Sequence, residues 1–101
     1  MELIAGRFRL LAEPMRLRIL HTLDDREMSV SELVAATGAN QANISKHLGI
    51  LLDAGVVSRR KQGLTANYRV ADDSIFVLCD AVCSSLKDNL ETRRNALAEM
   101  L

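Results

Sequence analysis

The sequence has few aromatic residues, prolines and cysteines, and it has no long apolar run. Of its 101 residues, three are aromatic, one is proline and two are cysteine. No segment approaches the roughly 18 consecutive apolar residues of a membrane-spanning helix. The first residues, 1–7, lack the basic-then-apolar order of a signal peptide. We therefore expect one domain, residues 1–101, with an aliphatic core, in the cytoplasm, where two cysteines would stay reduced.

The chain also lacks an excess of charge of either sign, but its charges are unevenly distributed. Thirteen basic residues balance 13 acidic ones. Residues 40–70 carry five basic residues and one acidic residue, a net charge of +4, whereas residues 1–39 carry −1 and residues 71–101 carry −3. A basic block between neutral and acidic ends is typical of a surface that meets a polyanion such as nucleic acid.

The segment 29–55 has the pattern of a helix-turn-helix. Ser29 and Glu32 form a capping box, which predicts a helix start. Gly38 suits the left-handed turn that ends this helix, and Asn40 is a good N-cap for a second helix. Two short helices joined through a glycine turn are the arrangement that places the second helix in a DNA major groove.

The second of these helices has one apolar face and one outer face of small, polar or basic residues. Ile44, Leu48, Leu51 and Leu52 recur at helical spacing on the apolar face. The amides of Gln41 and Asn43 match an adenine edge, and Ser45 and Lys46 can reach phosphates or bases. The residues of this helix that we predict to contact DNA are Asn40, Gln41, Ala42, Asn43, Ser45, Lys46 and His47. His47 lies on the flank of the apolar stripe, so core packing competes with phosphate contact there.

Residues 56–70 change to a strand-like pattern. The runs 56–61 and 65–70 flank Gly63, which predicts a β-hairpin, or wing, directly after the recognition-type helix. Its predicted DNA contacts are Arg60, Lys61, Gln62 and Thr65, through phosphates or the minor groove. The alternative is that the basic tip only protects a sheet edge from pairing.

The terminal segments 3–12 and 73–98 are predicted helices with more apolar surface than one copy can cover. The apolar stripe of the last helix contains Ile75, Cys79, Val82, Cys83, Leu86 and Leu90. We therefore expect a mainly α fold, with four helices, a small β-hairpin and a fifth helix, that forms a homodimer through the first and last helices. Such a dimer presents two recognition helices to two half-sites of double-stranded DNA.

Three motifs resemble the ArsR/SmtB family of bacterial repressors. The segment 13–20 (EPMRLRIL) resembles the family's Pro-x-Arg-x-x-Ile-Leu opening. The segment 40–48 (NQANISKHL) is similar to its recognition helix, and 51–57 (LLDAGVV) is similar to the segment that follows. The resemblance implies a homodimeric winged helix that represses its own operon until an inducer releases it from an inverted-repeat operator.

Two sensor sites known in that family, one for arsenic and one for zinc, are absent from this sequence. Arsenic-sensing members carry two cysteines at the start of the helix before the recognition helix, where this chain has Ser29 and Ser31. Serine hydroxyls do not replace soft thiolates as ligands for arsenic. Zinc-sensing members use Asp, His, His and Glu along the last helix, but no histidine follows His47.

Cys79 and Cys83 are the remaining candidate metal ligands. They lie four residues apart on one helix face. With a third ligand from a partner helix they could bind a thiophilic ion such as As(III), Cd(II) or Zn(II). They could instead serve as a redox or reactive-sulfur sensor, or simply be buried as small apolar residues.

Two other classes of function compete with DNA binding. Zero net charge and the acidic last segment allow a winged helix that binds only proteins. An enzyme is disfavoured because the sequence shows no nucleophile–base arrangement and no glycine-rich phosphate loop. We therefore expect a regulator that is not an enzyme.

Overall fold

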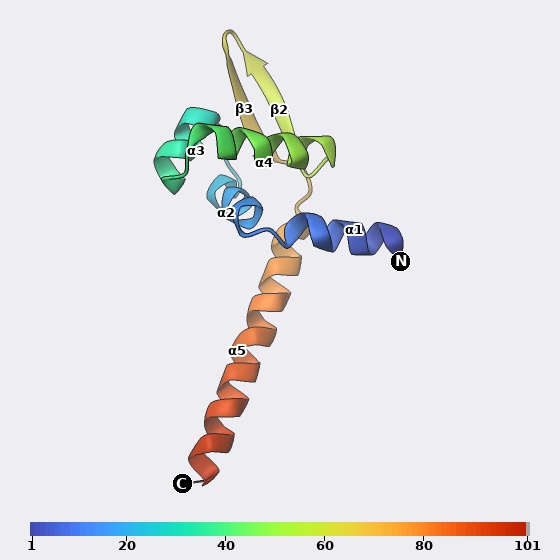
Figure 1. The fold of residues 1–101 in the computed structure, drawn as a ribbon, viewed down its shortest axis with the longest axis vertical. Helices are drawn as coiled ribbons and strands as arrows, with labels where there is room; N and C mark the ends of the chain where they lie inside the picture. The colour runs from blue at the N-terminus through green and yellow to red at the C-terminus, as the bar shows by residue number, and fades with distance from the viewer. Residues whose placement is uncertain (101) are drawn as a thin grey trace.

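The computed structural model describes residues 1–100, and these residues form five helices and a three-stranded sheet (Figure 1). In chain order the elements are α1 (Glu2–Leu11), α2 (Pro14–Leu23), β1 (Met28–Ser29), α3 (Val30–Thr37), α4 (Gln41–Asp53), β2 (Val57–Gln62), β3 (Thr65–Val70) and α5 (Ser74–Met100). The predicted order of helices and hairpin is confirmed, with one strand added.

The short interactions that start and end the central helices are those expected from the sequence. The Ser29 hydroxyl accepts from the Glu32 amide at 3.2 Å, and the Glu32 carboxylate accepts from the Ser29 amide at 3.0 Å. Gly38 ends α3 with φ +73°, a backbone conformation that favours glycine. The Asn40 side chain accepts from the Asn43 amide at 2.7 Å and so caps α4. These caps fix the turn between α3 and α4.

The sheet contains a strand that we did not predict. The strand order is β1-β3-β2, and both pairings are antiparallel. In the β2–β3 hairpin, Val57 pairs with Val70 at the base and Gln62 with Thr65 near the tip. β1 has only two residues, and its Met28 pairs with Tyr68, 40 residues later. Two residues are too few to show the alternation of a strand in the sequence. β1 is therefore recognised only from its pairing with β3 in the structure.

The core is aliphatic and lies where α2, α3 and α4 meet the base of the sheet. Its fully buried large side chains are Ile19, Leu20, Leu23, Leu33, Ile44, Leu48, Leu51, Val56 and Val57. Ile75 is the one buried residue of α5. The remainder of that helix therefore has little of its own chain to pack against.

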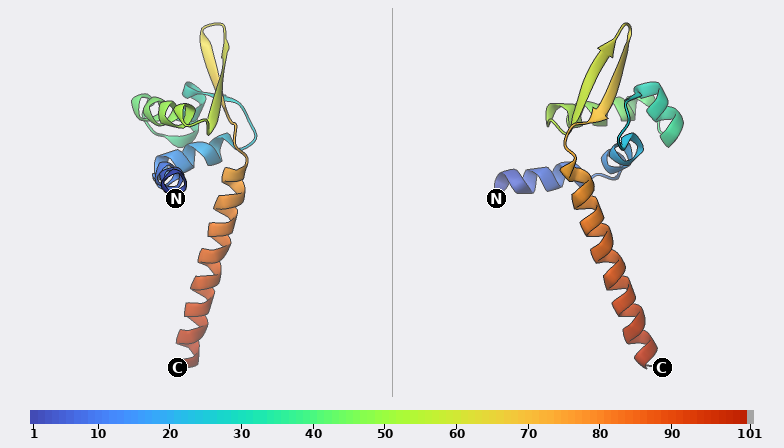
Figure 2. Two further views of the ribbon diagram at one scale, coloured as in Figure 1. Left: turned by 90° about the vertical axis from the view of Figure 1, so that its right-hand side faces the viewer. Right: turned by 180° about the vertical axis from the view of Figure 1, so that it is seen from behind.

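The two ends of the molecule have different characters (Figures 1 and 2). The hairpin projects from one end beside α4, and α5 extends away from the opposite end over much of the 63 Å long axis. Large apolar side chains on α1 and α5 remain exposed: Leu3, Ile4, Phe8, Val77, Val82, Leu86, Leu90, Leu97 and Met100. None of the helices within residues 1–100 combines the length and apolar character needed to cross a bilayer.

Candidate nucleic-acid interface

The outer face of α4 is open to solvent. Gln41, Ala42, Ser45 and Lys46 are exposed, and Asn43 is half-buried. The N-cap residue Asn40 is also exposed, although its side-chain oxygen is occupied by the Asn43 amide. No bulky apolar side chain interrupts this face, so a polar partner can approach the helix along its first two turns.

His47 does not belong to that face. Its exposed fraction is 5%, and Ile44 and Leu48 beside it in α4 are also buried. The Arg16 side chain donates through Nε to His47 Nδ1 at 3.2 Å, and Glu13 Oε2 lies 3.7 Å from Nε2. The ring of His47 therefore lies on the inner side of α4, away from the outer face that carries the other predicted DNA contacts.

The register of the hairpin divides the predicted wing residues between its two faces. Lys61 pairs with Ala66 and shares a face with Arg59, whereas Arg60 and Gln62 point to the other face with Thr65. All five polar side chains named here are exposed. The Thr65 hydroxyl donates to the Gln62 carbonyl at 2.9 Å, which closes the turn at Gly63.

Arg59 is a further candidate contact of the wing, which we did not predict. Its signal was present in the sequence, because alternation along a strand places residues 59 and 61 together. At the base of the hairpin the same face carries the buried Val57 and Val70. The face changes from apolar to basic as the hairpin leaves the core, which leaves Arg59 and Lys61 in solvent.

Arg60 is already paired within the chain. Its guanidinium donates to both carboxylate oxygens of Glu27, from Nη2 at 2.7 Å and from Nε at 3.1 Å. The donated hydrogen bonds lower the pKa of the Glu27 carboxyl below its usual 4.5. The pair ties β2 to the segment before β1, so a DNA phosphate would compete with Glu27 for Arg60.

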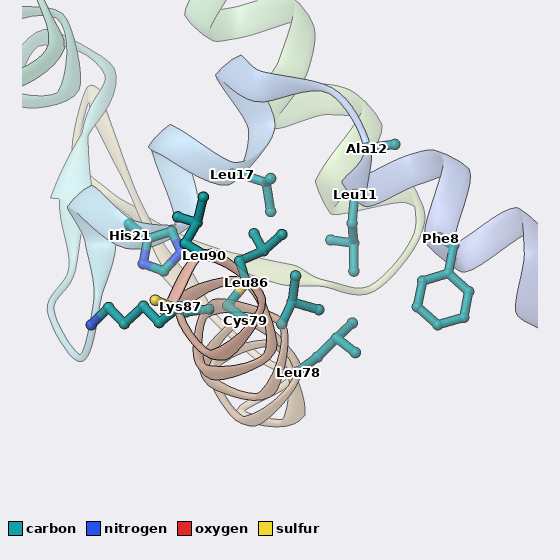
Figure 3. A pocket seen from close by; sticks show the side chains of 12 residues that line it. Phe8, Leu11, Ala12, Leu17, His21, Leu78, Cys79, Leu86, Lys87 and Leu90 are labelled. Atoms are coloured by element: carbon teal, nitrogen blue, oxygen red, sulfur yellow. The ribbon is translucent and has the colours of Figure 1, made fainter. Parts of the chain in front are cut away.

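A groove of about 590 Å³ lies between α5 and the first two helices (Figure 3). Phe8, Leu11 and Leu17 line one side. Leu78, Leu86 and Leu90 of α5 line the other side. Leu86 is 58% exposed and Leu90 62%, although both are large and apolar. Exposed apolar surfaces of this kind are typical of sites where proteins associate or ligands bind.

Cys79 and Cys83 both line this groove. Cys79 is half-buried and Cys83 exposed, and neither is in a disulfide. Across residues 1–100 no cluster of three or more His, Cys, Asp or Glu side chains could hold a metal ion. Two thiolates leave a tetrahedral site incomplete, so one copy of the chain supplies only part of such a site.

Comparison with known proteins agrees with this geometry. The family described as "Bacterial regulatory protein, arsR family" matches residues 13–59. The HTH-type transcriptional regulator Rv0081 of Mycobacterium tuberculosis is 41% identical over 78 residues, which cover 76% of this chain and 68% of that protein. The crystal structure of Rv0081 superimposes with a TM-score of 0.80 at 38% identity, covering 91% of this chain and 93% of that one.

Two further relatives are informative. A probable mercury resistance operon repressor of Streptomyces lividans is 38% identical over 68 residues, which cover 67% of this chain but only 54% of that protein. The homodimeric winged helix-turn-helix DNA-binding domain of Mb0332 from Mycobacterium bovis has a TM-score of 0.73 at 32% identity, covering 87% of this chain and 82% of that one.

These proteins are regulators and not enzymes, as we expected for this chain. Their winged helix-turn-helix architecture is the one built here by α3, α4 and the β2–β3 hairpin. The match includes the opening of α2, the recognition-type helix and the start of the wing. This chain therefore belongs to the arsR family of bacterial transcriptional regulators, with a winged helix-turn-helix fold.

Proposed function

We propose that the chain works as a homodimer that binds an inverted-repeat operator and represses its own operon until an inducer releases it. The observation that carries the proposal is the exposed, small and polar outer face of α4 beside a projecting basic hairpin. α4 would enter the major groove, where Gln41 and Asn43 would read base edges. Lys46 and the wing cations would neutralise phosphates.

The proposed dimer would form through α1 and α5. These helices leave nine large apolar side chains in solvent, and the groove between them is apolar. A second copy offers the same surface in return, as a two-fold interface requires. The homodimeric Mb0332 domain supports this arrangement. Two copies would place two α4 helices about one DNA turn apart.

The test is a titration of the full chain onto duplex DNA from its own promoter at several salt concentrations. Affinity should fall steeply as salt rises, because each phosphate contact releases a counterion. Replacing Gln41 or Asn43 by alanine should relax the preference at one base pair by about 1–3 kcal/mol. Binding to no duplex would instead favour a winged helix that recognises only proteins.

For the inducer, we propose a thiophilic metal or metalloid ion bound by Cys79 and Cys83. Both cysteines lie in the groove that the second copy would close, so the partner subunit could supply the missing ligand. Bound thiolates would neutralise the ion and hold α5 in one position. The mercury-resistance repressor among the relatives supports a soft ion. The runner-up is a redox or reactive-sulfur signal at the same thiols, favoured by the exposure of Cys83.

These alternatives separate in one set of measurements. Cys79→Ser and Cys83→Ser should abolish release from DNA by arsenite, cadmium or zinc if an ion is the inducer. Loss of release by peroxide or persulfide alone would favour the sulfur signal. Unchanged release by every compound would leave both cysteines as packing residues. Metal content and thiol titration of the purified dimer check the same point without DNA.

A further inference from the structure

The buried side of α4 carries a polar connection to the rest of the chain. His47 is the one polar residue of α4 that is buried, and its ring meets two side chains from α2 and its N-cap. Arg16 Nε donates to His47 Nδ1 at 3.2 Å, and Glu13 Oε2 lies 3.7 Å from Nε2. A buried polar contact is costly to leave unmade, so these partners hold the ring in place.

The same arginine reaches a third helix. Arg16 Nη1 donates to the carbonyl of Leu10, in the last turn of α1, at 3.1 Å. Glu13 caps α2 by accepting from the Arg16 amide at 3.1 Å. One guanidinium therefore joins α1, α2 and α4. Arg7 adds a weaker contact from α1 to the end of α4, at 3.4 Å from the Ala54 carbonyl.

The contact requires a hydrogen-bond acceptor at position 47 and two suitably placed donors at position 16. Nδ1 accepts the hydrogen bond from Arg16 through its lone pair, so a replacement at position 47 must offer an acceptor atom at the same place. Arginine supplies two donors at a fixed angle, and a lysine ammonium cannot satisfy both the ring and the carbonyl in the same way. An apolar residue of similar size at position 47 would fill the space but leave Arg16 Nε without its acceptor.

We infer that Arg16 and His47 are positioning residues, which hold α4 at the rotation and distance from α1 that DNA reading needs without touching DNA themselves. The inference rests on the proposed function. His47 directly follows Lys46, so a turn of α4 about its axis would displace the outer face and the buried ring together. α1 belongs to the proposed dimer surface, so the Arg16 contact would also connect that surface to the reading helix.

The test compares two variants of His47 that fill similar space. A duplex selected by the wild-type chain from a random-sequence library serves as the specific probe, and a scrambled duplex of equal composition serves as the non-specific one. His47→Leu should lower affinity for the selected duplex about tenfold, the loss expected from one base contact. The scrambled duplex should be affected much less. His47→Asn should restore binding, because its side-chain oxygen can replace Nδ1 as acceptor.

Arg16→Lys provides a second variant in case His47→Leu fails to fold, and thermal unfolding of each protein monitors that. It should reduce the ratio of selected to scrambled affinity in the same direction. Equal binding by the leucine and asparagine variants of His47 would overturn the inference. So would a salt dependence weakened by about one counterion in His47→Leu, since that would indicate a direct phosphate contact. A wild-type chain that selects no sequence would instead refute the proposed function.

Discussion

Lys46 is the only lysine or arginine within α4, and its side chain is exposed. Lys46→Ala should therefore weaken binding to every duplex by a similar factor. The slope of log affinity against log salt should fall by about one, because one phosphate contact is lost. Arg94→Ala, in the second half of α5, is the matched control and should leave both quantities unchanged. A loss confined to one sequence would show that Lys46 reads a base.

The position of His47 on the flank of the apolar stripe could be predicted from the sequence, but its contacts could not. Arg16 and Glu13 precede it by 31 and 34 residues, and only the packing of α2 against α4 brings them together. The exposure of Gln41 and Lys46, the predicted DNA contacts, could be foreseen from helical periodicity alone, which a short window of sequence contains.

Gly49 lies inside α4 on its exposed side, with no atom within 4 Å of an added Cβ. At the scale of the element, a glycine there weakens the helix. Gly49→Ala should raise the free energy of unfolding by about 0.5–1 kcal/mol. Gly49→Leu has similar helix propensity, but its bulk should obstruct a DNA surface close to α4. We expect the leucine variant to be stable and to bind DNA poorly, measured by thermal unfolding and duplex titration. If Gly49→Leu bound DNA normally, the DNA would not lie close to this side of α4.

Glu27 and Arg60 form one contact between the hairpin and the segment before β1, and that contact depends on pH. Because Arg60 lowers the pKa of Glu27, the ionised pair contributes stability above the usual value of 4.5. That contribution is lost as pH falls through the lowered pKa. Glu27→Gln should therefore be less stable than the wild type near neutral pH, and the difference should disappear once the pH has fallen below the lowered pKa of Glu27.

The measurement is thermal unfolding of both proteins between about pH 3 and pH 7. Arg60→Gln supplies the control, because Glu27→Gln should have no further effect in its background. The difference should be small and should shrink at high salt, since the pair is exposed. A difference that stays constant with pH would mean that Glu27 acts through packing and not through its charge.

Elements bounded by local interactions could be predicted from the sequence, and the one bounded by distant pairing could not. Ser29, Glu32, Gly38 and Asn40 lie within a few residues of the groups they cap, so their roles are evident in a short window. β1 exists only because Met28 reaches Tyr68 across the fold. The hairpin could be predicted because Gly63 lies between two runs with a strand-like pattern of residues.

At the scale of the whole molecule, the hairpin beside α4 and the far end of α5 lie at opposite ends, whereas α1 lies near the middle (Figure 2). The surface proposed for DNA is therefore separated from the α5 part of the surface proposed for dimerisation. α2 lies between them, joined to α3 by the Arg18 bond to the Thr37 carbonyl at 2.7 Å and to α4 by Arg16. This separation allows a change at α5 to be tested without altering the outer face of α4. A single copy would therefore keep its own α4, the helix proposed to read DNA, but would lack the α4 of a partner copy.

Leu86 lies in the apolar groove and is largely exposed in one copy. Leu86→Glu should therefore leave the fold of one copy intact and prevent two copies from associating, because a charge buried in an apolar interface is unfavourable. Sedimentation should show a monomer where the wild type is a dimer. Affinity for a two-half-site duplex should fall by at least about 100-fold, since the second half-site no longer binds as part of one molecule.

Affinity of Leu86→Glu for a single half-site should stay close to that of the wild type, because the outer face of α4 is untouched. Ser84→Glu adds the same charge to the polar side of α5 and should remain dimeric. If Leu86→Glu stayed dimeric, α5 would not form the interface. If it became monomeric but kept full affinity for the two-half-site duplex, one copy would be sufficient to read the operator, and the paired half-sites would have no role in binding.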